Sequence, residues 1–157
     1  MKIRKVTEDT LPKVLGLLKQ AFARSNREVA LIEKLHKSNS EIDEWVCIHI
    51  NKVIGYIAFT KAYDGDAVCG LHLTTLAVKP EYQNQGIGAE LIRFALRQDK
   101  IKSQTLFVLG KAEYYEPFGF TRCSNPVCPF TNKKRHFLSL GSSFEHNFTV
   151  GYEKEFG

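Results

Sequence analysis

The pattern of hydrophobic and polar positions divides the first part of the chain into strands and helices. Segments in which apolar residues alternate with polar ones, or form short β-branched runs, predict strands, whereas apolar residues three and four apart predict helices. By these criteria, strands are expected at residues 2–6, 44–50 and 53–60, and helices at residues 11–22 and 27–37. The polar pair Asn51-Lys52 predicts a tight turn that joins the second and third strands as a hairpin.

The stretch of residues 71–99 combines a strand, a loop and a helix within a short length of chain. Residues 71–78 are largely apolar and β-branched, and Pro80 ends the strand because proline has no N–H to donate. A turn with Gly86 and Gly88 follows, after which apolar residues recur at helical spacing. A helix that begins in such a turn offers unpaired N–H groups and a partial positive charge, and glycines let an anion approach the backbone. The stretch therefore predicts a phosphate-binding site.

The remainder of the chain adds further strands and a short helix. Residues 105–109 (TLFVL) are largely apolar, as in a strand that is buried on both faces. A helix connects them to residues 71–78, so the two strands should pair in parallel. A short helix before Gly119 and a strand after it are expected next, and then strands at residues 137–140 and 144–150.

Two phosphate-binding motifs of other protein classes are absent from this region. Gly65 and Gly70 have the glycine spacing of the nucleoside-triphosphate P-loop but lack its lysine, and the third glycine of the dinucleotide fingerprint is also missing. The sequence instead has Q-x-x-G-x-G from Gln83 to Gly88, with Leu76-Ala77-Val78 just upstream. This combination resembles the coenzyme-A-binding motif of the GNAT superfamily of N-acetyltransferases.

The resemblance implies a cofactor and the residues that hold it. In the GNAT family the strand separates from its neighbour, its backbone pairs with the pantetheine arm of acetyl-CoA, and the N–H groups of the turn hold the pyrophosphate. Pantetheine contacts are thus expected at Leu76, Ala77 and Val78, and pyrophosphate contacts at Gln83, Asn84, Gln85, Gly86, Ile87, Gly88 and Ala89. The alternative for the turn alone is an ordinary strand-to-helix connection, in which glycine is common.

A second resemblance lies in the segment from Tyr114 to Phe120, which reads YYEPFGF. It is similar to the Y-x-x-x-G-F element of the same superfamily and matches most closely a branch of small, predicted bacterial acetyltransferases. Tyr115 stands at the position of the family's catalytic tyrosine, which implies that it protonates the leaving thiolate. The asparagine that many members carry about one turn earlier is absent from residues 108–111. The alternative for Tyr115 is a tyrosine packed in the core.

Acetyl transfer to an amine also requires a base and a donor for the oxyanion. The resemblance implies that a backbone N–H near Ala77 or Val78 is this donor. His72 corresponds to the first of two strand histidines in arylalkylamine acetyltransferases, a branch of the superfamily, and Thr74 replaces the second. Strand alternation predicts that His72 shares a face with Thr74, Leu76 and Val78. The alternatives are a structural His72, a base at Glu28, Glu33 or Tyr114, and a chain of water molecules.

Composition narrows the classes of function further. The net charge of +5 suits anionic ligands such as CoA, but the basic residues are scattered and no nucleic-acid-binding motif is present, so no nucleic-acid partner is expected. The four cysteines form no C-x-x-C pair, so we expect free thiols and no metal. No apolar run reaches the roughly 20 residues of a membrane span, and the polar N-terminus is unlike a signal peptide. We therefore expect a cytoplasmic protein with no membrane partner.

Together these patterns predict one N-acetyltransferase domain over residues 1–157. The expected fold is of the α/β (α+β) class, the GNAT fold, with a mixed central sheet of about six to seven strands, flanking helices and a splayed pair of parallel strands. The expected function is transfer of an acetyl group from acetyl-CoA to a primary amine by direct attack. The alternative is a non-catalytic acyl-CoA-binding sensor or subunit. The acceptor stays open between a small molecule and a protein amine, and a homodimer is an expectation from the family alone.

Overall fold

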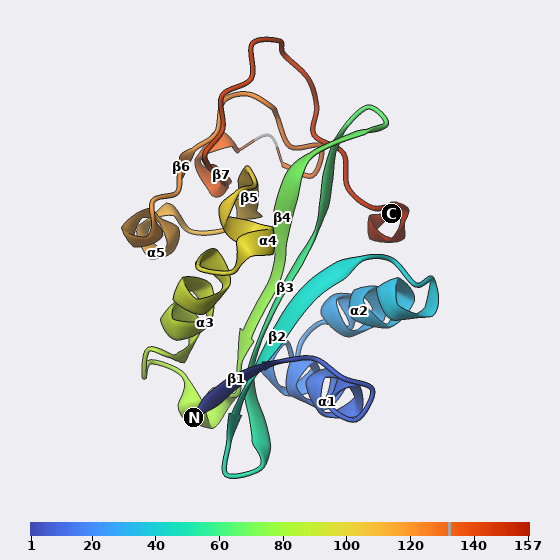
Figure 1. Ribbon diagram of the computed structural model, residues 1–157, viewed down its shortest axis with the longest axis vertical. Coiled ribbons are helices and arrows are strands. Elements are labelled where there is room, and N and C mark those ends of the chain that lie inside the picture. The colour runs from blue at the N-terminus through green and yellow to red at the C-terminus, as the bar shows by residue number, and fades with distance from the viewer. Residues whose placement is uncertain (132) are drawn as a thin grey trace.

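A mixed β-sheet forms the centre of the molecule, and helices cover both of its faces (Figure 1). The computed structural model describes residues 1–131 and 133–157, and within these ranges seven strands pair in the order β1-β2-β3-β4-β5-β7-β6. The strands are β1 (Lys2–Lys5), β2 (Ile42–His49), β3 (Lys52–Asp64), β4 (Ala67–Val78), β5 (Leu106–Leu109), β6 (Thr121–Arg122) and β7 (Phe137–Leu140). The helices are α1 (Leu11–Ala21), α2 (Arg27–Lys37), α3 (Ile87–Leu96), α4 (Asp99–Lys102) and α5 (Ala112–Tyr115), with 3₁₀ turns η1 (Pro80–Tyr82), η2 (Glu116–Phe118), η3 (Lys134–His136) and η4 (Lys154–Phe156). Neighbouring strands are antiparallel except β4 with β5, which confirms the predicted class and the parallel pair.

The two faces of the sheet carry separate hydrophobic layers. Helices α1 and α2 lie on one face, and α3 lies on the other (Figure 1). On the first face, Leu18 of α1 and Ile32 of α2 are fully buried in one cluster with Tyr56 of β3. On the second face, Leu91 of α3 is fully buried in a cluster with Ile57 of β3. Each such apolar side chain contributes about 1.5–3 kcal/mol of transfer free energy, so both layers hold β3 and β4 firmly between them.

The parallel pairing of β4 with β5 ends early, and the two strands then separate. The pairing runs from Leu71 opposite Leu106 to Leu73 opposite Val108, whereas β4 continues to Val78. The other edge of β4 stays paired with β3 up to Val78. Beyond Leu73, therefore, β4 has a strand on one side only, and the predicted splayed pair is confirmed.

A β-bulge at Thr74 changes which side chains of β4 share a face. The register between β3 and β4 shifts by one residue here, so Thr74 is an extra residue on β4. His72 and Thr74 line a cavity against α2, and Ala77 is also buried on the α1–α2 side, but Leu76 and Val78 pack toward α3. The prediction that alternation puts His72 on the same face as Leu76 and Val78 is therefore wrong, because the bulge reverses the alternation.

The turn between β2 and β3 lies one residue earlier than predicted. His49 pairs with Lys52, so the loop consists of Ile50 and Asn51 rather than Asn51 and Lys52. Both loop residues have positive φ, 49° at Ile50 and 61° at Asn51, as a tight turn of the I′ kind requires. A β-branched residue rarely adopts this conformation, so nothing in its residue type marks Ile50 as a turn position.

The strand predicted at residues 144–150 does not form. Within the described residues this region makes isolated bridges only, one of which joins Thr149 to Val127. The side-chain amide of Asn125 donates to the carbonyl of Phe144 at 3.3 Å and to that of His146 at 2.9 Å. A side chain thus supplies the hydrogen bonds that a neighbouring strand would have supplied.

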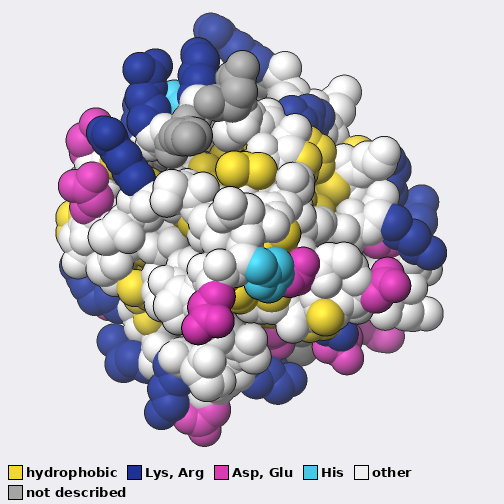
Figure 2. Space-filling model, turned by 90° about the horizontal axis from the view of Figure 1, so that it is seen from above, with side chains coloured by type: hydrophobic (Ala, Val, Ile, Leu, Met, Phe, Trp, Pro, Cys, Tyr) yellow, Lys and Arg dark blue, Asp and Glu magenta, His cyan; other side chains and the backbone are white. Residues whose placement is uncertain are grey.

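Charged side chains of both signs are spread over the surface. Viewed from the end of the sheet where β3 joins β4, basic side chains lie mainly around the outline, with acidic ones between them (Figure 2). Across residues 1–131 and 133–157, no helix combines the length and the apolar character that crossing a membrane requires. The same ranges contain no group of three or more His, Cys, Asp or Glu side chains that could hold a metal ion. The cysteines are free thiols, as expected.

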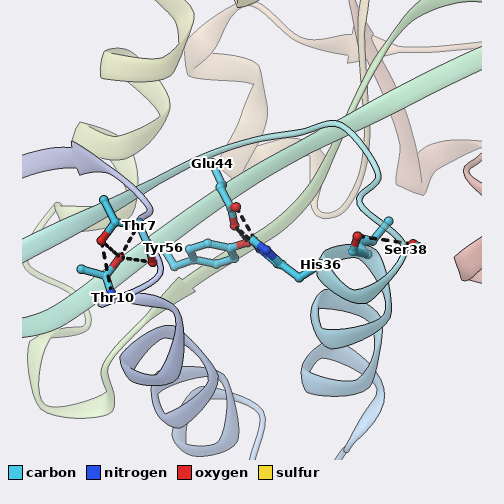
Figure 3. Close-up of polar contacts among 7 residues, drawn as sticks. Thr7, Thr10, His36, Ser38, Glu44 and Tyr56 are labelled. Atoms are coloured by element: carbon cyan, nitrogen blue, oxygen red, sulfur yellow. Dashed lines mark hydrogen bonds and ion pairs between the residues drawn. The ribbon is translucent and has the colours of Figure 1, made fainter.

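A polar network around Glu44 links α2 to the sheet (Figure 3). The hydroxyl of Tyr56, a residue with no exposed surface, donates to Oε1 of Glu44 at 2.7 Å. On the other side of this carboxylate, Nε2 of His36 on α2 lies 2.9 Å from Oε2 of Glu44. Burial, together with the carboxylate, raises the pKa of Tyr56, so its hydroxyl remains a donor. The network therefore links α2, β2 and β3 through one carboxylate.

Replacing Tyr56 with phenylalanine tests the contribution of this network to stability. Tyr56→Phe keeps the ring but leaves the Glu44 carboxylate with His36 as its one partner among the described residues, and a hydrogen bond to a charged group is worth about 1.5–3 kcal/mol. We expect the free energy of unfolding, measured by chemical denaturation, to fall by that amount. Tyr82→Phe is the matched control, because the Tyr82 hydroxyl has no hydrogen-bond partner in the described part of the chain. Equal losses in the two variants would contradict this account.

Candidate functional site

The turn between β4 and α3 forms a cradle of backbone N–H groups. Gly86 is the residue before the helix and has φ of +83°, a left-handed conformation that favours glycine. Glu90 is the first residue whose N–H bonds back to Gly86, at 3.0 Å, so the N–H groups of the three residues between them have no helical partner. These three are Ile87, Gly88 and Ala89. They carry the partial positive charge of the N-terminus of α3 and could bind an anion.

The position of the cradle is fixed by close packing of α3 on β3. A Cβ atom on Gly55 of β3 would lie 2.9 Å from Cδ1 of Leu91 and 3.1 Å from Cγ2 of Ile87. Both distances are shorter than ordinary van der Waals contact, so any larger residue would have to displace these side chains. The first turn of α3 therefore has a defined place beside the strands.

Two glutamine side chains stabilise the loop that leads into the cradle by hydrogen bonds to backbone carbonyls. The side chain of Gln83 donates to the carbonyl of Val78 at 3.0 Å, and that of Gln85 donates to the carbonyl of Glu81 at 3.3 Å. Asn84, between them, has φ of +63°. Residues 83–86 are exposed, so the loop offers its backbone to solvent. The structure thus brings all seven predicted pyrophosphate residues into one loop and helix turn.

The open edge of β4 presents backbone groups that no strand satisfies. The N–H of Lys79 donates to the carbonyl of Ile54 on β3 at 2.8 Å. Because N–H directions alternate along a strand, that of Ala77 also points to β3, whereas those of Leu76 and Val78 point to the open side. Of the three predicted pantetheine residues, Leu76 and Val78 therefore direct their N–H groups to the open side. The N–H of Ala77 points to β3 and is not available there.

Tyr115 lies in the core cluster that contains the last paired residues of β4 and β5. Its side chain is 9% exposed and meets the ring of Phe120 edge-on, with the ring centroids 5.7 Å apart. Its hydroxyl has no hydrogen-bond partner among the described residues. Burial raises the pKa of Tyr115 to about 12, so the group stays protonated near neutral pH. This arrangement provides a hydroxyl that can donate to a ligand placed beside it.

Gly110 accounts for the close approach of Tyr115 to the end of β5. A Cβ at this position would lie 2.5 Å from Cε2 of Tyr115, which leaves no room for any other residue type. Gly110 belongs to the segment 108–111, in which the asparagine common in the family is absent. The chain therefore has a tyrosine ring packed where the segment leaves β5.

Tyr114 points toward the cradle, which the sequence did not indicate. Its hydroxyl lies so close to Gly88 that a Cβ on Gly88 would overlap it. The side chain is 42% exposed, and its ring packs edge-on against Tyr115 at a centroid distance of 5.0 Å. The two adjacent tyrosines thus diverge, one into the core and one toward the N-terminus of α3. Their pairing in the sequence was the only available signal.

A cavity of about 370 Å³ opens on the α2 side of the sheet, where β4 and β5 separate. Its walls come from α2, β4, β5 and the C-terminal segment, residues 144–156. The lining residues are Arg27, Glu28, Ala30, Leu31, Lys34, His72, Leu73, Thr74, Thr75, Phe107, Val108, Leu109, Phe130, Tyr152, Glu155 and Phe156. Because Leu73 and Val108 are the last paired residues of β4 and β5, the cavity reaches the split from the side opposite α3.

His72 lies in the cavity wall and is 2% exposed. Its Nε2 donates to the carbonyl of Gly151 at 3.0 Å, and its ring stacks on Tyr152 with centroids 3.7 Å apart. Since a carbonyl only accepts, the proton is on Nε2, and Nδ1 keeps a lone pair without a partner in the described residues. Burial lowers the pKa of His72 to about 4, so the ring is neutral near pH 7. The residue combines a structural contact with a free acceptor nitrogen.

Glu28, which lines the cavity, has a carboxylate oxygen without a hydrogen-bond partner in the described part of the chain. Oε2 of Glu28 on α2 is buried and accepts no hydrogen bond, and it is the one such side-chain atom among the residues described. Glu155, the other acidic residue of the lining, accepts hydrogen bonds from the hydroxyls of Ser38 and Ser40. Glu33 is outside the cavity lining. Of the acidic alternatives for the base, Glu28 therefore lines the same cavity as His72, and Glu33 does not.

The C-terminal segment supplies a wall that sequence reasoning missed. Gly151 exchanges backbone hydrogen bonds with Tyr63 of β3, at 3.0 and 2.7 Å, and the Tyr63 hydroxyl donates to Glu153 at 2.5 Å. These contacts place Tyr152 and Phe156 over the cavity. The aromatic character of residues 144–156 was the only signal, and it does not say which strand such a segment will meet.

Comparisons with known proteins connect this arrangement with one family. Residues 41–122, which are more than half of the chain, match the family model of the acetyltransferase (GNAT) domain. The uncharacterized N-acetyltransferase YjhQ of Escherichia coli (strain K12) is 43% identical over 77 residues, which are 46% of this chain and 42% of YjhQ. The alignment thus spans less than half of the length of that relative.

Solved structures share the fold over almost the whole chain. The GNAT family N-acetyltransferase YhbS from Escherichia coli, in complex with CoA, has a TM-score of 0.89 at 22% identity and covers 99% of this chain and 91% of its own. A GNAT family acetyltransferase from Brucella melitensis, in complex with acetyl-CoA, has a TM-score of 0.83 at 26% identity and covers 99% and 97%. The shared fold therefore extends through the C-terminal region, where the sequence resemblance is weak.

The low pKa of His72 predicts a pH dependence of stability. Between about 6.5, the ordinary value, and about 4, the unfolded chain binds a proton that the folded chain does not. The free energy of unfolding should therefore fall as the pH falls through this window, by about 3 kcal/mol in total, and should be unaffected above it. In His72→Gln, whose amide can still donate to Gly151, this part of the acid destabilisation should vanish. Denaturation curves measured from pH 7.5 to 4 check it, and parallel pH dependence in parent and variant would contradict it.

Proposed function

Because the chain belongs to the acetyltransferase (GNAT) family, we propose that it transfers an acetyl group from acetyl-CoA to a primary amine. The observation that carries the proposal is the meeting of three features where β4 leaves β5. These are the open edge of β4, the N–H cradle at the start of α3, and a cavity on the opposite side of the sheet. A thioester and an amine could thus approach one point from two faces.

In this proposal acetyl-CoA is held by backbone groups. The amides of the pantetheine arm pair with the free edge of Leu76 and Val78, as a neighbouring strand would. The pyrophosphate accepts hydrogen bonds from the N–H groups of residues 83–89, at the positive end of α3. The Tyr114 hydroxyl, beside Gly88, adds one more donor in this region. The two relatives with CoA and acetyl-CoA bound support the choice of cofactor.

The transfer itself is a direct attack of the neutral amine on the thioester carbon. The amine loses a proton to Nδ1 of His72, directly or through water, and Glu28 is the second acceptor in the cavity. The new C–N bond forms as the carbonyl oxygen becomes an oxyanion, which a backbone N–H on the open edge of β4 stabilises. The C–S bond then breaks, and the thiolate takes the proton of the Tyr115 hydroxyl. Tyr115 then regains a proton from solvent and His72 releases one to solvent, so the products are an acetamide and free CoA.

The alternative is a CoA-binding protein without catalysis. It accounts for the cradle but gives no role to the Tyr115 hydroxyl, which has no partner in the described residues, or to the cavity behind the split. Thiol release from acetyl-CoA in the presence of amines separates the two functions. We also propose that residues 1–157 act as one acetyltransferase domain, since the C-terminal segment contacts α2, β3 and β4.

Replacing Gly86 tests the cradle. Gly86→Val forces a β-branched residue into a left-handed conformation and should disorganise the first turn of α3, so CoA affinity measured by calorimetry should fall at least about tenfold. The matched control is Gly65→Val. Gly65 has φ of +61° in the β3–β4 turn, and a Cβ there also meets nothing within 4 Å, so the backbone strain is similar but remote from the cradle. Equal CoA affinity in a folded Gly86→Val protein and in the control would contradict CoA binding at the cradle.

Replacing Tyr115 tests its role as an acid. Tyr115→Phe removes only the hydroxyl, so CoA affinity should be unchanged while turnover falls about 10²- to 10⁴-fold, the usual contribution of general acid–base catalysis. Tyr114→Phe is the comparison, because it removes a hydroxyl from the cradle side and should affect CoA affinity rather than the chemical step. Steady-state kinetics with an amine found by screening, together with calorimetry, separates the two effects. Full activity of Tyr115→Phe would show that the residue is structural.

A further inference from the structure

We infer that a second pocket, separate from the cradle and from the cavity at the split, binds the diphosphate group of a small anionic molecule. This pocket has a volume of about 300 Å³ and lies where α1 meets the turn between β2 and β3. The inference goes beyond the proposed function and does not depend on it. Three features carry it: a lining with three lysines and no acidic residue, a glycine in the middle of a helix, and a place on the face of the sheet opposite the cradle.

Three lysine side chains from separate elements line the pocket. Lys13 belongs to α1, Lys52 is the first residue of β3, and Lys79 follows β4. Among the described residues, neither Lys13 nor Lys52 makes an ion pair. Nζ of Lys79 lies 3.7 Å from an oxygen of Glu81, an exposed residue outside the pocket, and such an exposed pair is weak. The pocket thus gathers positive charge that a ligand with several neighbouring negative charges would neutralise.

The other polar side chains of the lining also carry N–H donors. Gln20 of α1 and Asn51 of the β2–β3 turn each have an amide NH₂ group. Leu17 and Val53, which also line the pocket, are buried in the same cluster, so the packing of α1 on β3 fixes the positions from which the donors extend. Phosphate oxygens accept several hydrogen bonds each, and lysine is a common phosphate ligand. The lining therefore suits a phosphate group.

Gly16 leaves the pocket open on the side of α1. A glycine inside a helix is less favourable than alanine, so its presence needs a reason. Gly16 has no left-handed φ, and a Cβ at this position would meet no atom within 4 Å, so neither the backbone nor the packing requires glycine. Lys13 and Gln20, three residues before and four after it, lie on the same face of α1. A side chain at residue 16 would occupy the space between these donors, and the approach of a ligand accounts for its absence.

The pocket cannot hold the pyrophosphate that the cradle binds in the proposed function. Helix α1 covers one face of the sheet, and α3, where the cradle begins, lies on the other (Figure 1). None of residues 83–89 lines the pocket. Its volume is at the lower end of the range of about 300–1,000 Å³ for ligand pockets, so it admits a diphosphate group or little more. The two sites can therefore bind their anions at the same time.

Calorimetry on the full chain with three probes tests the ligand class. The probes are inorganic pyrophosphate, orthophosphate and ADP, in buffer without divalent cations. We expect pyrophosphate to bind at least about tenfold more tightly than orthophosphate, because its additional charges reach more than one lysine. Equal affinity for the two would overturn the inference. ADP that binds as tightly as pyrophosphate would support a nucleotide as the source of the diphosphate, and weaker binding of ADP would support a free diphosphate.

Lysine variants then locate the bound pyrophosphate. Lys13→Gln and Lys52→Gln remove the charge but keep a long polar side chain, and each should lower the affinity about 3- to 10-fold. Lys19→Gln is the matched control, because Lys19 is an exposed residue of α1 outside the lining. Unchanged affinity in both pocket variants would place the anion elsewhere, the cradle included, and overturn the inference. An equal loss in the control would reduce it to general attraction by a basic protein.

Replacing Gly16 separates a binding role from a structural one. Gly16→Leu introduces a better helix former whose Cβ is unobstructed, so the midpoint of chemical denaturation should rise. The new side chain should also fill the space between Lys13 and Gln20 and lower the affinity for pyrophosphate at least about tenfold. A variant that becomes more stable and binds pyrophosphate as the parent does would show that the pocket is not the binding site.

Discussion

The end of the β4–β5 ladder after Leu73 and Val108 is the constraint on which the rest of the site depends. A strand inside a sheet normally has hydrogen-bond partners on both edges, and an edge without them needs other groups. In this chain Gln83 satisfies the carbonyl of Val78, and the remaining edge groups are available to a ligand with amides of its own. The separation also opens the sheet between α3 and the cavity. One interrupted ladder therefore creates the open strand edge and the access from the cavity to the split. In the proposed function these are the places of the thioester and of the acceptor.

The parts of the structure that depend on local sequence could be predicted, and those that depend on distant contacts could not. The strand-turn-helix from β4 to α3 follows from a proline, two glycines and helical periodicity within a few residues of each other. The bulge at Thr74 leaves no such signal, because an extra residue in one strand is visible only against its partner β3. The turn at Ile50 shows the same limit, since the pairing of His49 with Lys52 overrides the residue type.

His72 illustrates how a site prediction and its structural alternative can describe one residue. Sequence reasoning offered a base or a packed histidine as separate possibilities. Nε2 of His72 donates to Gly151 and its ring stacks on Tyr152, whereas Nδ1 has no partner among the described residues. The contacts to Gly151 and Tyr152 could not be foreseen, because 79 residues separate His72 from Gly151. The same contacts form the wall that gives the cavity its aromatic character.

The two halves of the site also differ in how far apart their parts lie along the chain. The cradle is closed by residues 76–90, whereas the cavity joins α2 to Tyr152 and Phe156 across more than a hundred residues. Closing a long loop loses more entropy than closing a short one, and surface segments can open while the rest of a domain stays folded. Gly151 and η4 are held by a few hydrogen bonds and by the stacking of Tyr152 on His72, so their local opening would expose the cavity and leave the cradle intact. The cradle and the cavity thus depend on segments of different local stability, and conditions that disturb one need not disturb the other.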